Sequence, residues 1–340
     1  MIQYIFAIVG AGNISKVHAD VIQSLHNAKL AAVIDTDCVK AQSFAEMYGC
    51  AHYNSFDEMQ RKHDVDVVSV CTPATTHADV AREIINAGKH IIFEKPIDTD
   101  TAKVRRLIAE AENKGVIISC IFQHRFDDAV IKAKKAIMEG RLGSIHFGAC
   151  HTKWYRGDAY FNGRTKATDG GGALINQAIH YIDLLLYLVG DIVEVYGSCG
   201  VFSHKGIDIE DLGVAVVKFK NRGVGMIEGT TAAYPGLNSL LDIYGDKGSL
   251  RIVDDALVYY NVMDITKEEE ETMISSTVEK TGASNPMDFP IESHRRQYID
   301  VLNALENGTE PLVGGWEALK SVDVVSAIYT SSSTGLPVKI

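Results

Sequence analysis

The sequence predicts two domains: an α/β domain with a doubly wound parallel sheet, and an α+β domain with a mostly antiparallel, open sheet. A chain of 340 residues exceeds the size at which one hydrophobic core usually stops growing. Up to about residue 122, short apolar runs rich in β-branched residues alternate with stretches of helical period, whereas afterwards several strands follow one another. We therefore expect domains at residues 1–122 and 123–340.

The first domain repeats an apolar strand followed by a helix. Continuous apolar strands joined by helices of this length are typical of a parallel sheet that helices cover on both faces. The predicted strands are residues 5–10, 29–35, 51–53, 65–72, 90–96 and 116–122.

The second domain combines one strongly apolar helix with many strands. The helix follows a glycine triplet in GGGALINQAIHYIDLLLYLVG, and tight turns such as KNRG and GDKG join the strands of the antiparallel sheet. KEEEE and the polar segment up to residue 290 are expected to form a surface loop. Two helices, at about 291–306 and 316–333, are expected to close the chain.

Charge and cysteine content exclude several classes of partner. The 44 acidic and 33 basic residues give a net charge of −11, which repels nucleic-acid phosphates and anionic membranes. The six cysteines form no C-x-x-C metal or redox pair, and several lie in apolar runs. We find no signal peptide and no apolar stretch long enough to span a membrane, so we expect a cytoplasmic protein without a metal site.

The turn after the first strand, GAGNIS, has the pattern of a dinucleotide-binding loop. Gly10 permits a sharp turn and Gly12 lets the backbone approach a pyrophosphate, while Asn13 and Ile14 begin a helix that offers N–H groups to the anion. Asp35 closes the second strand, where a carboxylate accepts hydrogen bonds from the adenosine ribose and repels a 2′-phosphate. This pattern favours NAD over NADP.

The fourth strand ends in CTPATTH. In an open parallel sheet, ligands bind beyond the carboxyl ends of the strands, so Thr72, Pro73 and His77 are expected to line the path of the cofactor. For His77 a second interpretation stays open, in which it begins a helix and bonds only the local backbone.

The fifth strand ends in FEKP, which places an ammonium group at the edge of an apolar run. Lys95 either reaches water or points into a cleft at the same edge of the sheet as Gly12 and Thr72. Glu94 before it, which we count among the cofactor-binding residues, and a proline after it fix where the side chain leaves the strand. This favours the cleft.

The apolar helix of the second domain carries a polar pair. Asn176 and His180 are four residues apart and share one helical face, and Asp183 is close enough in sequence to orient the histidine ring. A histidine on an apolar helix is more often a structural residue than a catalyst. Beside a dinucleotide and a lysine, however, His180 becomes a candidate general base.

Three arginine and tryptophan side chains are candidates for substrate binding. Trp154 and Arg156 lie in the loop before the apolar helix, where an arginine can clamp a carboxylate or phosphate, although simple anchoring of the loop is the alternative. Arg125, just past the sixth strand, either reaches the cleft or caps the helix that follows.

Taken together, these motifs resemble those of the glucose–fructose oxidoreductase, inositol dehydrogenase and rhizopine-catabolism (Gfo/Idh/MocA) family. The motifs are T-P-x-x-x-H, E-K-P and G-G-G-x-x-x-[DN]-x-x-x-H, and the resemblance continues to GDKGSL and GLPVKI. It implies a Rossmann domain that binds NAD, a second domain whose open sheet often builds oligomers, and hydride transfer at a carbon of a sugar, cyclic polyol or nucleotide sugar. It also implies a cis peptide bond between Lys95 and Pro96.

The resemblance assigns the catalytic lysine to Lys95 and the helix histidine to His180. We expect His180 to take the hydroxyl proton and Lys95 to stabilise negative charge on the same oxygen. Many polyol dehydrogenases of the family have aspartate where this chain has Asn176, which orients a hydroxyl but cannot ionise. The N-Q-x-x-H pattern is similar to that of relatives acting on UDP-N-acetylglucosaminuronate at C3.

Two other activities occur in the family. Some relatives are glycosidases that retain NAD and oxidise, then re-reduce, C3 of the sugar, and others are NAD-bound sensors without turnover. Lys95 and His180 argue against a sensor, but they do not separate a dehydrogenase from a glycosidase. We expect a homo-oligomer that acts on a small sugar or polyol and has no nucleic-acid or membrane partner.

Overall fold

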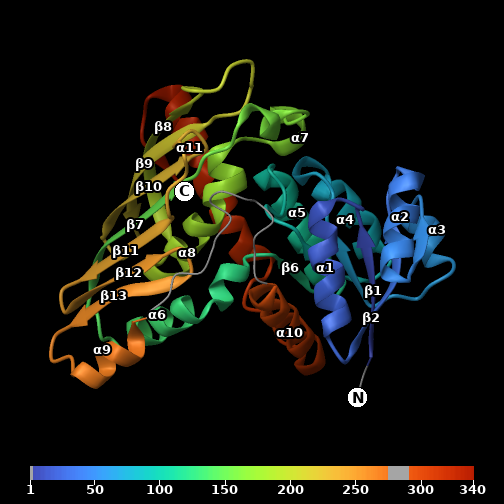
Figure 1. Ribbon diagram of the computed structural model, residues 1–340, viewed down its shortest axis with the longest axis horizontal. Coiled ribbons are helices and arrows are strands. Elements are labelled where there is room, and N and C mark those ends of the chain that lie inside the picture. Colours follow the sequence, from blue (N-terminus) through green and yellow to red (C-terminus); the bar gives the residue numbers. More distant parts are fainter. Residues whose placement is uncertain (1–2, 275–290) are drawn as a thin grey trace. The chain divides into compact units, whose positions relative to one another are not determined.

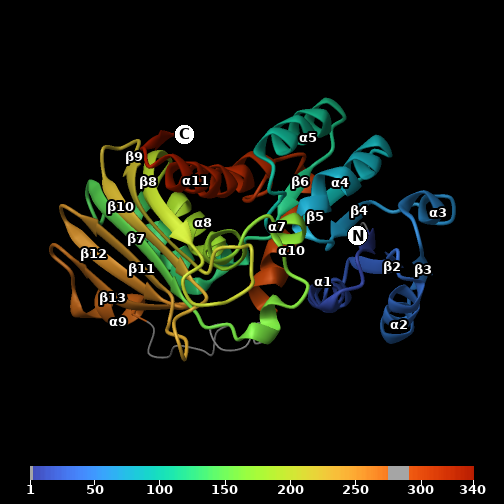
Figure 2. The same cartoon turned by 90° about the horizontal axis from the view of Figure 1, so that it is seen from above.

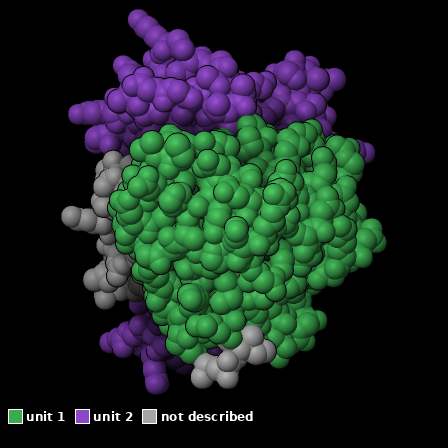
Figure 3. Space-filling model, turned by 90° about the vertical axis from the view of Figure 1, so that its right-hand side faces the viewer, with its two compact units in different colours: residues 1–123, 291–319 green, residues 124–290, 320–340 purple. Residues whose placement is uncertain are grey.

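The computed structural model describes residues 3–274 and 291–340. The chain divides into two compact units, coloured separately in Figure 3. Unit 1 consists of residues 1–123 and 291–319, and unit 2 of residues 124–290 and 320–340. The first segment of unit 1 ends within one residue of the boundary expected from the sequence, but the structure assigns residues 291–319 to unit 1 rather than to the second domain.

Unit 1 contains a six-stranded parallel sheet in the order β3-β2-β1-β4-β5-β6. The order reverses between β1 and β4, as in a doubly wound fold, and confirms the predicted class. The strands are β1 Tyr4–Val9, β2 Ala28–Ile34, β3 Ala51–Tyr53, β4 Val67–Val70, β5 His90–Phe93 and β6 Ile118–Cys120. The helices are α1 Asn13–Ser24, α2 Cys38–Tyr48, α3 Phe56–Gln60, α4 His77–Asn86, α5 Thr101–Asn113 and α10 Glu292–Asn307, with the short 3-10 turn η1 at Ala74–Thr76. Helices α1, α2, α4 and α5 of this unit are labelled in Figure 1.

Helix α10 joins unit 1 through a buried chain of polar side chains. The Tyr298 hydroxyl oxygen lies 2.6 Å from His18 Nδ1 and 2.8 Å from Ser69 Oγ, and His18 Nε2 lies 2.9 Å from Glu94 Oε1. The apolar face of α10 packs into the same core as β1 and α1. These contacts are the physical reason why a segment remote in sequence belongs to the first unit.

Unit 2 contains an eight-stranded sheet in the order β13-β12-β11-β7-β10-β9-β8-β14, in which only β7 and β10 pair in parallel. This confirms the mostly antiparallel sheet. The strands are β7 Ile145–Lys153, β8 Ile192–Gly200, β9 Leu212–Phe219, β10 Val224–Thr230, β11 Leu240–Gly245, β12 Gly248–Val253, β13 Ala256–Val262 and β14 Val338–Lys339.

Helices cover one face of this sheet. Figure 2 shows α8 and α11 on that face, and Gly148 of β7 lets α8 approach closely, since a Cβ atom there would lie 2.7 Å from a Val189 methyl group. The Ser331 hydroxyl of α11 accepts a hydrogen bond from the Gly197 amide of β8. The helical segments are η2 Gln123–Phe126, α6 Asp128–Met138, η3 Asp158–Phe161, α7 Lys166–Asp169, η4 Ala173–Ala178, α8 Ile179–Val189, α9 Lys267–Met273 and α11 Gly315–Thr334, of which residues 320–334 belong to unit 2.

Two details correct the sequence analysis. KEEEE forms helix α9, which Thr266 caps by accepting a hydrogen bond from the Glu269 amide, so this part of the expected loop was wrong. The rest of that loop, residues 275–290, lies outside the described residues. Among the described residues, one stretch, 166–189, has the length and apolar composition of a membrane span, but 89% of its most apolar window is buried inside the protein.

The Tyr298 hydroxyl offers a direct test of how α10 is held. Tyr298→Phe keeps the ring but removes the partner of His18 and Ser69, which should cost about 1–3 kcal/mol because buried polar groups lose their bonds. For a domain of this size the unfolding temperature should fall by about 2–4 °C per kcal/mol, measured by calorimetry. Tyr259→Phe, at a half-exposed position on β13, is the matched control and should change it little. Equal unfolding temperatures of the two variants would contradict this role of the Tyr298 hydroxyl.

The His18–Glu94 pair predicts a pH dependence. Burial by itself lowers the pKa of His18, but Cys71, Tyr298 and Glu94 raise it well above 6.5. Burial raises the pKa of Glu94, yet the hydrogen bond and charge of His18 bring it below 4.5. The raised pKa of His18 stabilises the fold below pH 6.5, and this stabilisation is lost as the pH rises through the folded-state pKa. The lowered pKa of Glu94 stabilises the fold above pH 4.5, and this stabilisation is lost as the pH falls through the folded-state pKa.

The stability difference between the natural chain and His18→Gln should therefore be largest between pH 4.5 and 6.5 and should shrink on both sides. Thermal unfolding at a series of pH values measures this difference. His52→Gln, at an exposed position, supplies the control. A difference for His18→Gln that is independent of pH would show that the pair carries no charge.

Candidate functional site

The glycine turn of unit 1 has the geometry that a dinucleotide requires. Gly10 has φ of +99°, and a Cβ atom there would lie 2.6 Å from the carbonyl oxygen of Cys71, so only glycine fits. At Gly12, no heavy atom lies within 4 Å of a built Cβ, which leaves the backbone open to a ligand. Helix α1 begins at Asn13 without a side-chain cap or an acid in its first turn, and Ile14 follows. This end of α1 suits a pyrophosphate.

Asp35 lies directly after β2, as predicted. Its Oδ2 atom accepts a hydrogen bond of 2.7 Å from the Ala11 amide in the glycine turn, and Oδ1 accepts one of 2.9 Å from the Asp37 amide. The carboxylate is therefore held in a fixed orientation beside the turn. These residues fit NAD, with Gly12 and the start of α1 toward the pyrophosphate and Asp35 toward the adenosine ribose.

The loop after β4 shows how His77 is held. Thr72 and Pro73 are partly exposed at the carboxyl end of β4, whereas His77 is buried at the start of α4. His77 Nε2 lies 2.8 Å from the Thr72 carbonyl oxygen and Nδ1 lies 2.9 Å from that of Pro96. Burial lowers the pKa of His77, although the hydrogen bonds to the Thr72 and Pro96 carbonyl oxygens oppose this shift. His77 therefore bonds the backbone of its own loop and that of Pro96, and its place along the path of the cofactor stays a prediction.

Lys95 follows β5 at the same edge of the sheet and is partly buried. Its amide donates a 3.1 Å hydrogen bond to Glu94 Oε2, whose other oxygen is bonded to His18. The Lys95–Pro96 peptide bond is cis, as expected. Glu94 thus fixes the backbone of the lysine from within the core.

In unit 2, the glycine triplet leads into a π-helical turn rather than a continuous α-helix. This turn, η4, contains Asn176, and α8 begins immediately after it with His180 in its first turn. The Asn176 side chain donates a 2.8 Å hydrogen bond to the Gly171 carbonyl oxygen, and His180 is 8% exposed. Single π turns are frequent at functional sites, and neither periodicity nor composition distinguished this one from an α-helix.

A second histidine, which the sequence analysis missed, contacts His180. The ring of His124 lies at 90° to that of His180, with centroids 5.2 Å apart, and His124 Nδ1 lies 2.6 Å from Asp127 Oδ2. Burial lowers the pKa of His124, but Asp127 raises it above its ordinary value overall. The position just past β6, beside Arg125, was the available signal.

Arg125 is buried and bonded to a carboxylate of α8. It is 2% exposed and donates from Nε to Asp183 Oδ2 (2.8 Å) and from NH2 to Asp183 Oδ1 (2.7 Å), while its guanidinium lies 4.6 Å from the Tyr187 ring centroid. Asp183, expected to orient His180, is therefore the partner of Arg125. This pair fixes α8 in the interior of unit 2.

Trp154 and Arg156 stack on each other in the segment after β7. Both are buried, and the Arg156 guanidinium lies 4.9 Å from the Trp154 ring and 5.6 Å from the Tyr160 ring. The Arg164 guanidinium lies 4.3 Å from the centroid of the same Tyr160 ring. Burial lowers the pKa of the Arg156 guanidinium. The predicted residues thus share one cationic and aromatic cluster.

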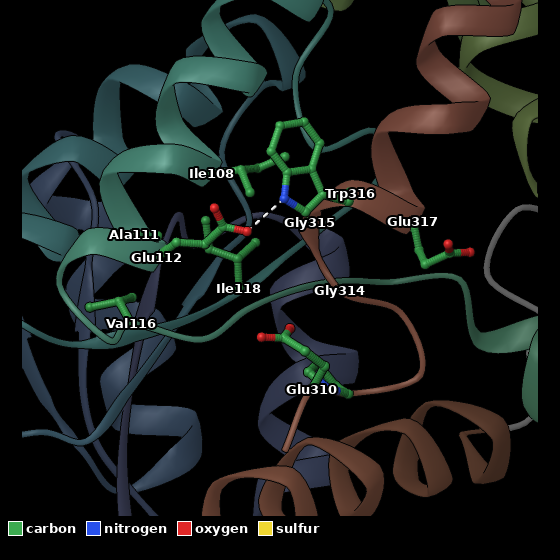
Figure 4. Close-up of a pocket in the computed structure, with 11 residues that line it drawn as sticks. Ile108, Ala111, Glu112, Val116, Ile118, Glu310, Gly314, Gly315, Trp316 and Glu317 are labelled. Carbon is green, nitrogen blue, oxygen red and sulfur yellow. Dashed lines mark hydrogen bonds between the residues drawn. The ribbon is translucent and has the colours of Figure 1, made fainter. Parts of the chain in front are cut away.

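A pocket of about 220 Å³ lies elsewhere in unit 1 (Figure 4). The Trp316 indole N–H donates a 2.6 Å hydrogen bond to Glu112 Oε1 at its side. None of the predicted site residues lines it. The lining residues are Ile108, Ala111, Glu112, Val116, Ile118, Glu310, Pro311, Gly314, Gly315, Trp316 and Glu317.

Several similar proteins are named as dehydrogenases. The WlbA dehydrogenase from Bordetella pertussis, crystallised with NADH and UDP-GlcNAcA, is 29% identical, with a TM-score of 0.87 over 99% of both chains. The inositol 2-dehydrogenase of Rhizobium meliloti is 29% identical over 72% of this chain and 74% of its own length. The myo-inositol 2-dehydrogenase of Thermotoga maritima is 27% identical over 91% of this chain and 90% of its own length.

Two family models cover nearly the whole chain. The oxidoreductase family, NAD-binding Rossmann fold, matches residues 5–122, and the oxidoreductase family, C-terminal alpha/beta domain, matches residues 134–340. The predictions of an NAD-dependent oxidoreductase and of NAD as its cofactor are confirmed. By fold, glycine turn and sequence, the chain belongs to the Gfo/Idh/MocA family of NAD-binding oxidoreductases.

Proposed function

We propose that this protein is a dehydrogenase that transfers hydride between a secondary ring hydroxyl of a sugar, cyclic polyol or nucleotide sugar and NAD. The observations that support the proposal are two sets of residues, each described within its own unit. Unit 1 presents Lys95 at the carboxyl edge of a dinucleotide-binding sheet, and unit 2 presents Asn176 and His180 where a π turn passes into α8.

The chemistry assigns one task to each side chain. When bound, NAD supplies the acceptor of the hydride that leaves the substrate carbon. His180 takes the hydroxyl proton as general base, and Lys95 donates a hydrogen bond to the same oxygen and stabilises its negative charge. Asn176 orients the hydroxyl without ionising. The product is a ketone at the oxidised carbon.

Among substrates, we propose a nucleotide sugar that carries an acidic group. Two facts support this class: the N-Q-x-x-H pattern, and the likeness to the WlbA dehydrogenase crystallised with UDP-GlcNAcA. The buried Arg156, stacked on Trp154, is proposed to meet the acidic group, since guanidinium pairs well with carboxylate or phosphate. Arg125 is proposed to hold α8 rather than the substrate, because its side chain is buried and donates two hydrogen bonds to Asp183.

The first experiment measures absorbance at 340 nm with NAD against inositols, aldoses, aryl glycosides and UDP-sugars, including UDP-glucuronates. NADH should form with one class. His180→Ala should lower kcat about 10²–10⁴-fold, because it removes the general base. Lys95→Met should lower kcat about 10²–10³-fold, because it removes charge stabilisation. His52→Ala and Lys62→Met, at exposed positions, are matched controls and should keep full activity.

Other outcomes distinguish the remaining activities. Aglycone release from an aryl glycoside without NADH formation identifies the glycosidase that retains NAD. Tight NAD binding with no turnover of any substrate identifies a sensor, and either result contradicts the dehydrogenase.

We also propose that the open face of the unit 2 sheet builds a homo-oligomer. Its outward side chains form an apolar patch, in which Tyr196, Val216 and Met226 are neighbours across β8, β9 and β10. Exposed apolar patches of this kind usually mark protein interfaces.

The six free cysteines, which suit a reducing compartment, support a cytoplasmic location.

Val216→Lys should dissociate the oligomer, because it introduces an unpaired charge at the centre of the patch. Light scattering coupled to size-exclusion chromatography measures the mass. Met47→Lys, at an exposed position on α2, is the matched control and should leave the mass unchanged. A natural chain that is already monomeric at micromolar concentration contradicts this assembly.

A further inference from the structure

One glutamate holds the entire start of the helix that carries Asn176 and His180. Glu210 Oε2 accepts a 2.7 Å hydrogen bond from the Gly172 amide and Oε1 accepts one of 2.9 Å from the Leu174 amide. The backbone oxygen of Glu210 accepts a 2.8 Å bond from the Ala173 amide between them. Three successive amides that a helix start leaves unpaired are thus satisfied by a single residue.

This cap explains two glycines of the triplet, Gly171 and Gly172. A Cβ atom on Gly172 would lie 1.8 Å from the Glu210 backbone oxygen, and one on Gly171 would lie 2.2 Å from the Tyr329 hydroxyl oxygen. That hydroxyl donates a 2.8 Å hydrogen bond to Glu210 Oε1. Gly172 therefore makes room for the Glu210 backbone, and Gly171 for the tyrosine that supports the carboxylate.

The next residue, Asp211, holds the arginine segment. Its buried carboxylate accepts hydrogen bonds from the amides of Phe202, Ser203 and His204, at 2.8 to 2.9 Å. His204 Nδ1 lies 3.0 Å from Asp211 Oδ2, and His204 Nε2 lies 2.7 Å from the carbonyl oxygen of Arg156. The aspartate is thereby connected, through one imidazole, to the backbone of the arginine.

The Asp211 main chain holds the same segment from a second side. Its carbonyl oxygen accepts hydrogen bonds from the Thr231 amide (2.9 Å) and the Thr230 hydroxyl (2.8 Å). The Thr230 and Thr231 carbonyls in turn accept from the amides of Trp154 (3.0 Å) and Arg156 (2.8 Å). Two chains of bonds therefore run from Asp211 to the Trp154–Arg156 segment.

We infer that the dipeptide Glu210–Asp211 is a positioning element of the site: Glu210 sets the helix start that carries Asn176 and His180, and Asp211, through His204, sets the segment that carries Arg156. The inference rests on the proposed function for the roles of those residues. The two side chains are adjacent in sequence, so the spacing between the proton-accepting group and the arginine is set by one peptide unit. Neither carboxylate is proposed to touch the substrate.

Trp154 provides a test of the Asp211 branch that needs no substrate. The chain has two tryptophans, so Trp316→Phe leaves Trp154, which is 7% exposed, as the single emitter. In that background, Asp211→Asn and His204→Ala should raise acrylamide quenching of Trp154 about twofold or more, because the stacked segment opens locally. His204→Gln should restore low quenching, since its amide still donates to the Arg156 carbonyl. Asp191→Asn, a surface ion-pair residue, is the matched control.

Hydrogen exchange tests the Glu210 branch in the full chain. In Glu210→Gln the amide NH₂ replaces one acceptor of the helix start, so backbone exchange over residues 171–178 should accelerate about tenfold. Glu194→Gln, which breaks only a surface ion pair, should leave this exchange unchanged. With a substrate in hand, Glu210→Gln should lower kcat at nearly constant KM, whereas His204→Ala should raise KM with kcat within about twofold.

The two proposals fail in different ways. If no substrate is found, quenching and exchange still decide the positioning role. Unchanged Trp154 quenching in both Asp211→Asn and His204→Ala, or unchanged exchange in Glu210→Gln, overturns it. If Asp211→Asn does not fold, His204→Ala against His204→Gln carries the test of that branch.

Discussion

In unit 1, the common direction of the parallel strands determines where the candidate site residues lie. Parallel strands all point the same way, so whatever follows β1, β2, β4 and β5 must emerge at one edge. The residues that follow them are the glycine turn, Asp35, Thr72 and Lys95, which are scattered over more than 80 positions of sequence. No long-range side-chain contact is needed to bring these groups to one edge, because strand direction alone does so.

In unit 2, by contrast, long-range contacts of buried carboxylates hold the candidate site residues in place. Removing a carboxylate from water is costly unless hydrogen bonds or a partner charge replace the lost hydration. Asp211 has three amides and an imidazole, Glu210 has two amides and a hydroxyl, and Asp183 has both arms of Arg125. Each buried carboxylate is stable only where these donors surround it. The helix start and the arginine segment therefore have few alternative positions.

The contrast explains what the sequence could predict. The six strands of unit 1, the glycine turn and the cis bond at Lys95 followed from local patterns or family resemblance, and they are confirmed. The packing of α10 against unit 1 could not be predicted from local patterns, because Tyr298 contacts His18 from a position 280 residues away in sequence. Nor could the pairing of Arg125 with Asp183, 58 positions apart, or the capping of Gly172 by Glu210. The π turn was missed because i→i+4 and i→i+5 helices bury the same apolar residues.

The discontinuity of unit 1 also matters during synthesis. A ribosome releases the first 123 residues long before α10, so unit 1 of the growing chain stays unfinished while residues 124–290 of unit 2 are translated. During that interval His18 lacks the tyrosine hydroxyl that it meets in the finished fold, and the apolar floor that α10 covers faces solvent or a chaperone. Unit 1 is accordingly complete only after residues 291–319 have been synthesised.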